Sequence, residues 1–178
     1  MRNSCLLFPM IISFLYGSKS HQQFVPTPHI KEYIMSIRDV QYDYNSIQNL
    51  VFSPLQSIDD MDYKRFAETL KGLYDTLVMS EKILLEKLKS IENLSEMEIG
   101  LIDTLDIYAK FFGETIIQLS FICAKLYNYS NAISYPVNEY SRDMKKWEKL
   151  SDNYRLFGHS INGRLDELTI NVPRFYQF

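Results

Sequence analysis

The chain has 178 residues, of which 46% are hydrophobic and 14% aromatic, so it is long enough to form one domain with a sizeable core. Its 19 basic and 22 acidic side chains nearly balance, which excludes nucleic-acid binding driven by bulk positive charge. Six glycines and six prolines are few for a turn-rich β protein and favour a helical one. We therefore expect an all-α protein in which any anion-binding site is a local patch.

Residues 1–20 have the form of a secretory signal peptide. Arg2 precedes the apolar run CLLFPMIISFLYG, and the small residues of SKS follow it. The run is short and is broken by Pro9, so it does not predict a membrane-spanning helix. The alternative is an atypical N-terminus on a cytoplasmic protein.

Residues 21–58 are predicted to be a linker that contains a short helix within Ile30–Leu50. The loop that follows contains aspartates and Ser57, which can cap the next helix. From about Asp59, nine positions spaced alternately by four and three residues carry seven apolar side chains, which is a heptad seam. These positions are 66, 70, 73, 77, 80, 84, 87, 91 and 94. Ser95 and Glu98 then have the spacing of a capping box, which predicts the start of a new helix.

The second half of the chain carries one heptad frame from Ile102 to Leu168, in which seventeen of twenty positions are apolar. The frame passes through Pro136 without a change of register, whereas two unrelated helices would share a register about one time in seven. We therefore predict one long helix over about 98–168, bent at Pro136 because proline removes a backbone hydrogen bond. The seam residues that we expect in the core or in a dimer contact are Phe112, Ile116, Leu119, Leu126, Ile133, Val137, Tyr140, Met144, Trp147 and Tyr154.

A helix of that length would extend on the order of 100 Å, and the preceding helix would cover only about half of its seam. The expected fold is therefore a set of long antiparallel coiled-coil helices over residues 59–169, with a homodimer covering the rest of the seam. Residues 170–178 are short, aromatic and broken by Pro173, so we expect a tail.

Residues that could carry catalysis are sparse. Two of the three histidines lie in the expected linker, and His159 lies one step off the seam, where a surface or packing role is expected. Cys123 lies on the seam and should be a small buried side chain, and Cys5 alone could not complete a zinc site with it. Asp103 and Asp106 are expected on a solvated helix face. With no nucleotide-binding or zinc-protease motif in the sequence, we expect no enzyme activity, no cofactor, no metal and no small-molecule substrate.

A basic cluster follows Pro136 in the sequence. Its members are spaced so that they share one side of a helix, and they are Arg142, Lys145, Lys146 and Lys149. Lys125 extends the positive charge along the expected rod. Such a band can bind lipid phosphates, each charge contributing about 1 kcal/mol at an anionic membrane. Taken alone, the cluster is more often a solvated helix face, whose charge Asp143 and Glu148 temper.

Four stretches of the second half carry a resemblance to a known family. In chain order they are LDIYAKFFGETIIQL, YPVNEY, RDMKKWEKL and NYRLFGHSINGRL. In this order they resemble the BAR domain over about Phe66 to Leu168, most nearly the BAR domains that precede PH and Arf-GTPase-activating modules and those of the APPL adaptors. The resemblance implies a non-catalytic, cytoplasmic module of membrane trafficking or Arf-type signalling that dimerises into a crescent and binds curved anionic phospholipid membrane. The lipid-binding residues it implies are Lys125, Arg142, Lys145, Lys146 and Lys149. The family's full third helix and its PH and GTPase-activating domains have no counterpart in these 178 residues, so a fragment or reduced member is expected.

The alternative is a secreted all-α protein that acts through protein contacts. It rests on the signal-like residues 1–20 and on two glycosylation sequons, at Asn93 and Asn128. Ser130 of the second sequon occupies a seam position, so a glycan on Asn128 would lie close to a buried face. That placement counts against a glycosylated form.

Overall fold

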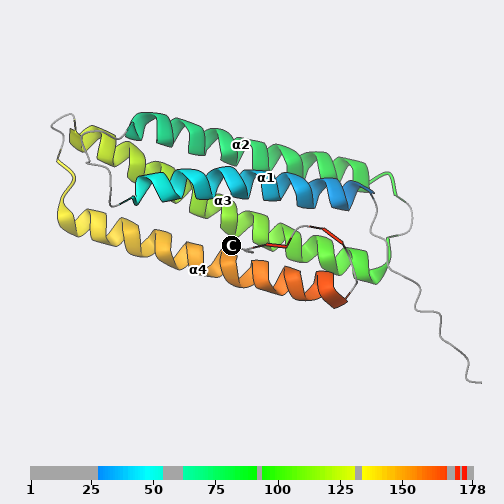
Figure 1. The fold of residues 1–178 in the computed structure, drawn as a ribbon. Helices are drawn as coiled ribbons and strands as arrows, with labels where there is room; N and C mark the ends of the chain where they lie inside the picture. The colour runs from blue at the N-terminus through cyan, green and yellow to red at the C-terminus, as the bar shows by residue number, and fades with distance from the viewer. Residues whose placement is uncertain are drawn as a thin grey trace, which may run out of the picture.

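The structure is a computed structural model that describes residues 28–53, 62–91, 94–130, 134–167, 171–172 and 174–175. In these ranges the chain forms four α-helices, α1 over Pro28–Val51, α2 over Tyr63–Leu88, α3 over Glu96–Ser130 and α4 over Val137–Glu167. Successive helices run antiparallel and form an elongated four-helix bundle (Figure 1). The all-α prediction is confirmed, whereas the predictions for residues 1–20 lie outside the described residues.

The single helix predicted over about 98–168 is wrong. α3 ends at Ser130, α4 begins at Val137, and the two helices pack side by side (Figure 1). Pro136 directly precedes α4, and its carbonyl oxygen accepts the hydrogen bond from the Tyr140 N–H at 3.0 Å. Proline is tolerated there because the first turn of a helix has no intrahelical use for its N–H groups. Pro136 therefore starts a new helix and does not bend a continuous one.

The heptad frame from Ile102 to Leu168 nevertheless predicts most of the buried residues of α3 and α4. The seam residues that are buried are Phe112, Ile116, Leu119, Trp147 and Tyr154, and those partly buried against the core are Leu126, Tyr140 and Met144. Val137 is 81% exposed because its frame position falls where α4 begins, and Ile133 lies outside the described residues. Because the seam packs between helices of one chain, the packing argument for a homodimer no longer applies.

The linker with a short helix predicted for residues 21–58 is corrected by α1, which spans 24 residues and forms one side of the core. Its buried residues are Ile30, Tyr33, Ile34, Ile37, Val40, Gln41, Tyr44, Ile47 and Val51. They recur every three or four residues, as the buried stripe of a helix requires. Apart from the buried Gln41, the polar residues between Asp39 and Asn49 are exposed or partly exposed, and they obscured this spacing in the sequence.

The predicted start of α3 is confirmed, and α2 begins at Tyr63, four residues after the predicted Asp59, with an aspartate as its expected cap. Asp62 caps α2 by accepting a hydrogen bond from the Arg65 N–H at 3.0 Å. At α3 the Ser95 N–H donates to the Glu98 carboxylate at 3.0 Å, and the Glu98 N–H donates to the Ser95 hydroxyl at 3.3 Å, which is the predicted capping box. On the predicted seam of α2, Leu70, Leu77 and Leu84 are buried.

Aromatic side chains fill the space between α1 and α4. The Trp147 indole N–H donates to the Tyr44 hydroxyl at 3.0 Å, and the Tyr44 ring lies edge-on to Phe112 and Tyr154. Further along, Phe175 is fully buried, so the tail predicted over residues 170–178 contributes to the core. Figure 1 shows the described residues of this segment, 171–172 and 174–175, in front of α3 and between α1 and α4.

α3 is the most apolar of the described helices. By length and composition its segment Glu96–Tyr129 could cross a membrane, and 56% of its most apolar window is buried inside the bundle. A core helix of a folded bundle meets the same criterion, so this helix supports no membrane-spanning assignment.

Candidate phosphate-binding face of α4

The basic cluster lies on the solvent side of α4. Arg142, Lys145, Lys146 and Lys149 are all exposed, because the opposite side of the helix buries Asp143, Trp147 and Ser151. The Arg142 side chain is 72% exposed. Among the ion pairs formed by the described residues, none includes any of the three lysines. We call these four residues the basic face of α4.

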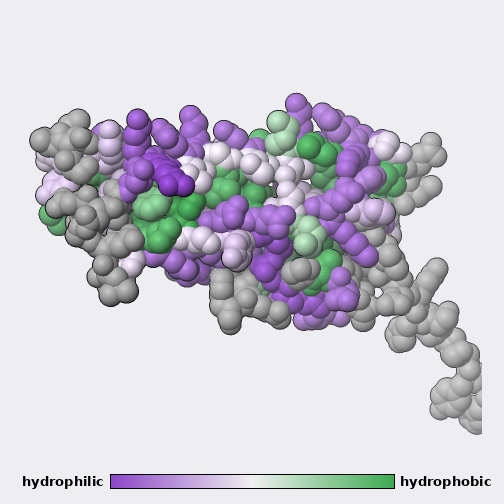
Figure 2. Space-filling model, turned by 45° about the horizontal axis from the view of Figure 1, so that its top comes forward, coloured by the Kyte–Doolittle hydropathy of each residue, from purple (hydrophilic) through white to green (hydrophobic). Residues whose placement is uncertain are grey.

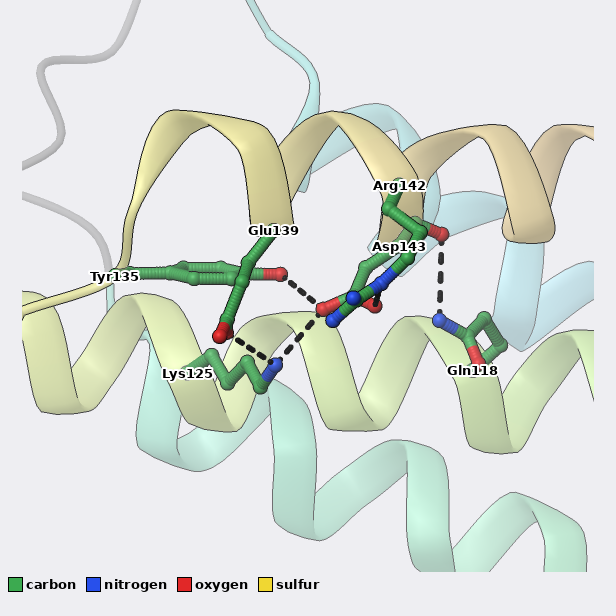
Figure 3. A network of polar contacts seen from close by, with 6 residues as sticks. All are labelled: Gln118, Lys125, Tyr135, Glu139, Arg142 and Asp143. Carbon is green, nitrogen blue, oxygen red and sulfur yellow. Dashed lines mark hydrogen bonds and ion pairs between the residues drawn. The ribbon is translucent and has the colours of Figure 1, made fainter.

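Lys125 does not belong to the basic face. Its ammonium group donates to the Asp143 carboxylate at 2.9 Å and to the Glu139 carboxylate at 3.2 Å (Figure 3). It also lies over the rings of Phe121 and Tyr135, at 4.4 Å and 4.9 Å from their centroids. Only 25% of the side chain is exposed. Its charge is therefore engaged within the protein, where it links α3 to α4.

Asp143 is the centre of this polar network (Figure 3). The Tyr135 hydroxyl donates to its carboxylate at 2.9 Å, and the Gln118 side chain of α3 donates to its backbone carbonyl at 3.2 Å. Burial raises the pKa of Asp143, but hydrogen bonds from Lys125 and Tyr135 and the charges of Lys125 and Arg142 outweigh it and lower the pKa overall. Hydrogen bonding to Asp143 in turn raises the pKa of Lys125. The network holds the start of α4 against the end of α3.

This arrangement leaves the basic face with an excess of positive charge. The sequence suggested that Asp143 tempers the cluster, but its carboxylate points to α3 and is neutralised there by Lys125 (Figure 3). Arg142 approaches that carboxylate only at 3.9 Å. Two exposed acids of α4 partly offset this charge, namely Glu148, which the sequence identified, and Asp152, which lies one turn beyond Lys149.

The other sequence candidates form no catalytic group in the described ranges. Cys123 is fully buried, and burial raises the pKa of its thiol to about 12, so it is not a thiolate near neutral pH. His159 and Asp103 are exposed on helix surfaces. No group of three or more His, Cys, Asp or Glu side chains in the described part of the chain could hold a metal ion. Of the two sequons, Asn93 lies outside the described residues and Asn128 is exposed in the last turn of α3.

A pair of carboxyl side chains between α2 and α3 was not predicted from the sequence. Glu81 lies within hydrogen-bonding reach of Asp106, and burial, followed by the hydrogen bond and charge of Asp106, raises its pKa to about 7. Burial and both carboxyl charges also raise the pKa of Tyr33 of α1, whose buried hydroxyl has no hydrogen-bond partner among the described residues. Asp106 is exposed, as expected, but its pairing with Glu81 was not predicted, because Glu81 lies on a different helix and no local pattern connects the two.

A small pocket of about 180 Å³ lies between α1 and α2. The Lys87–Glu32 ion pair at 2.7 Å and the Ser36–Ser80 hydrogen bond at 2.6 Å connect the two helices across it. Ligand pockets usually enclose roughly 300–1,000 Å³, so this one is small for a substrate site. Figure 2 shows the hydrophobic residues on the visible surface in separate groups divided by hydrophilic ones, so this view offers no broad apolar docking surface.

Comparison with protein-family models, with curated proteins and with solved structures finds no match for this chain. The basis for a functional proposal is therefore the chemistry of its own residues. The basic face of α4 places four exposed bases on one side of a helix, with the exposed acids Glu148 and Asp152 beside them.

Proposed function

We propose that this protein is a non-catalytic helical bundle that binds the phosphate groups of anionic membranes through the basic face of α4. The observation that carries the proposal is the exposure of Arg142, Lys145, Lys146 and Lys149 on one side of one helix. Each basic residue contributes about 1 kcal/mol near an anionic membrane. Four of them would support a peripheral, reversible and salt-sensitive attachment.

An apolar side chain lies on the same side of α4. Leu156 follows Lys149 by seven residues, or about two helical turns, and is 68% exposed. A leucine beside a row of bases suits the interface between lipid head groups and acyl chains, where apolar burial adds to electrostatic attraction. This contact would reduce the dependence of binding on charge alone.

The proposal keeps one part of the resemblance to BAR domains, namely a peripheral membrane module on the cytoplasmic side. It omits the crescent-shaped dimer, because the long bent helix from which we expected that shape is replaced by the α3–α4 hairpin. It also omits Lys125, whose charge Asp143 and Glu139 engage.

Co-sedimentation with liposomes tests the proposal. We expect binding to vesicles of phosphatidylcholine mixed with phosphatidylserine, little binding to phosphatidylcholine alone, and weaker binding as salt shortens the range of the attraction. Lys145→Glu with Lys146→Glu should weaken binding by at least about tenfold, because each reversal replaces an attractive charge with a repulsive one.

The matched control is Lys71→Glu with Lys82→Glu, which reverses two exposed bases on α2. This control changes the net charge equally and should leave binding nearly unchanged if α4 is the contact surface. Equal binding of the protein to neutral and anionic vesicles, or an equal loss in both double variants, would contradict the proposal.

A further inference from the structure

The side chain of Asn162 on α4 binds the main chain of Phe175. Its amide NH₂ donates to the Phe175 carbonyl oxygen at 2.5 Å, and its amide oxygen accepts from the Phe175 N–H at 2.8 Å. The Phe175 side chain is fully buried, and its ring lies edge-on to Tyr108 of α3 with 5.0 Å between the centroids. The Asn162 amide therefore fixes the main chain of a residue that belongs to the core.

Gly163 follows Asn162 directly in the sequence. Asparagine before glycine is prone to spontaneous deamidation, because glycine has no side chain to shield its main-chain nitrogen and adopts conformations that other residues avoid. The Gly163 nitrogen attacks the side-chain carbonyl carbon of Asn162, a C–N bond forms, and the amide nitrogen leaves as ammonia with the proton of the Gly163 N–H. Water then opens the cyclic imide at either of its carbonyl groups. The product is aspartate or isoaspartate, which carries one additional negative charge.

Two features of the fold restrain this reaction. Gly163 lies inside α4, whose helical backbone keeps its nitrogen away from the Asn162 side chain, and Phe175 holds that side chain by both of its polar atoms. The helical restraint is released when the end of α4 opens, and Asn162 lies five residues before Glu167, the last residue of the helix. Helix ends open at low cost, and glycine weakens a helix further. The contact with Phe175 therefore sets how often the Asn162 side chain is free to react.

We infer that Asn162–Gly163 is a site of spontaneous deamidation which the contact with Phe175 holds back, and that the conversion releases Phe175 irreversibly. The product carboxylate has no hydrogen to donate to the Phe175 carbonyl oxygen, which lies 2.5 Å from the amide nitrogen. The new charge also lies four residues before Asp166 and near the C-terminal end of α4, where the like charge and the helix dipole both oppose it. The inference does not depend on membrane binding.

Mass spectrometry of the folded chain, incubated at mildly alkaline pH and digested at intervals, tests the inference. The wild type should deamidate slowly at Asn162, and Phe175→Ala should do so several-fold faster, because a buried ring no longer anchors the main chain of residue 175. Circular dichroism shows whether this variant keeps its helices. If it unfolds, Phe175→Leu, which retains apolar volume in the core, replaces it in the comparison. Equal rates in the wild type and the folded variant would overturn the inference.

Gly163→Ala is the matched control for the chemistry. A methyl group on Gly163 has no neighbouring atom within 4 Å, and alanine favours a helix, so the variant should fold as the wild type does. It should largely suppress deamidation at Asn162, both alone and combined with Phe175→Ala. Deamidation at Asn162 that continues unchanged after Gly163→Ala would contradict the proposed reaction.

Asn162→Asp imitates one product and tests the release of Phe175. It should lower the melting temperature by about 2–4 °C, the shift that loss of roughly one hydrogen bond causes in a chain of this size. Asn153→Asp places the same charge on α4 nine residues before Asn162 and should change the melting temperature much less. If both variants lower it equally, the charge acts independently of Phe175, and release is not the consequence of deamidation.

Discussion

Glu81 and Asp143 are both carboxyl side chains at contacts between helices, but their neighbours shift the pKa in opposite directions. Asp143 accepts hydrogen bonds from Lys125 and Tyr135, which favour its ionised form. Glu81 is partly buried beside a second carboxyl, Asp106 of α3, and its proton is therefore held more tightly. At neutral pH the contact of Asp143 with Lys125 therefore stabilises the folded bundle, whereas the contact of Glu81 with Asp106 destabilises it.

The Glu81 pair predicts a pH-dependent stability. Since the pKa of Glu81 rises from 4.5 to about 7 on folding, the folded protein binds the proton more strongly than the unfolded chain. The contribution to the free energy of unfolding is fully present below about pH 4.5 and is lost as the pH rises through about 7. Glu81→Gln should remove this decrease and make the protein more stable than wild type at about pH 8, measured by urea denaturation at several pH values.

The group that faces the Glu81–Asp106 pair from a third helix is Tyr33 of α1. Glu86→Gln on the exposed side of α2 is the control, and its pH dependence should follow that of wild type. If Glu81→Gln and wild type lose stability in parallel between acidic and alkaline pH, the pair does not act as described.

At the scale of helices, α2 and α3 approach each other closely at Gly113. A methyl group added to Gly113 would lie 3.1 Å from a ring carbon of Tyr74 and 3.6 Å from a methyl carbon of Leu77. Gly72 on the exposed side of α2 has no neighbouring atom within 4 Å of such a methyl group. The two glycines thus separate the effect of helix packing from that of helix propensity.

Gly72→Ala should stabilise the protein by about 0.5–1 kcal/mol, because alanine loses less backbone freedom in a helix than glycine. Gly113→Ala should instead destabilise it by about 1 kcal/mol or more, since overpacking against Tyr74 exceeds the same gain in propensity. Urea denaturation followed by circular dichroism measures both. If Gly113→Ala stabilises the protein as much as Gly72→Ala, the close approach of α2 and α3 is not present in solution.

At the scale of the whole molecule, the α3–α4 hairpin brings together residues that a continuous helix would separate widely. The start of α3 lies beside the end of α4, where a methyl group on Gly100 would lie 3.3 Å from the Arg164 side chain. In one helix over 98–168, the same ends would be on the order of 100 Å apart. A distance between labels on the two helices therefore distinguishes the two architectures.

Spin labels at Asp103→Cys and Ser160→Cys, both exposed positions, should give a distance within roughly 30 Å, because packed helices lie 8–10 Å apart and the labels add their own length. Cys5 and Cys123 are replaced by serine in the same protein to prevent other labelling. Pulsed electron paramagnetic resonance measures the distance. A value on the order of 85 Å, that of 57 residues of continuous helix, would restore the rod and refute the hairpin.

The sequence by itself determined the local features of this protein. Helical spacing, the cap at the start of α2, the Ser95–Glu98 capping box and most of the buried faces depend on residues within one or two turns of each other, and all are confirmed. The exposed basic face of α4 follows from the same spacing. α1 was only partly predicted, because polar residues surround its buried stripe.

Only the tertiary structure decided how the helices are connected and which distant groups meet. A heptad frame that runs through Pro136 is equally compatible with a bent rod and with a hairpin, since both bury the same stripe. Contacts between α3 and α4, such as Lys125 with Asp143, accompany the hairpin and are not encoded by any local spacing. The same holds for Glu81 with Asp106 and for Phe175 with Tyr108, because these contacts form only once separate helices have packed.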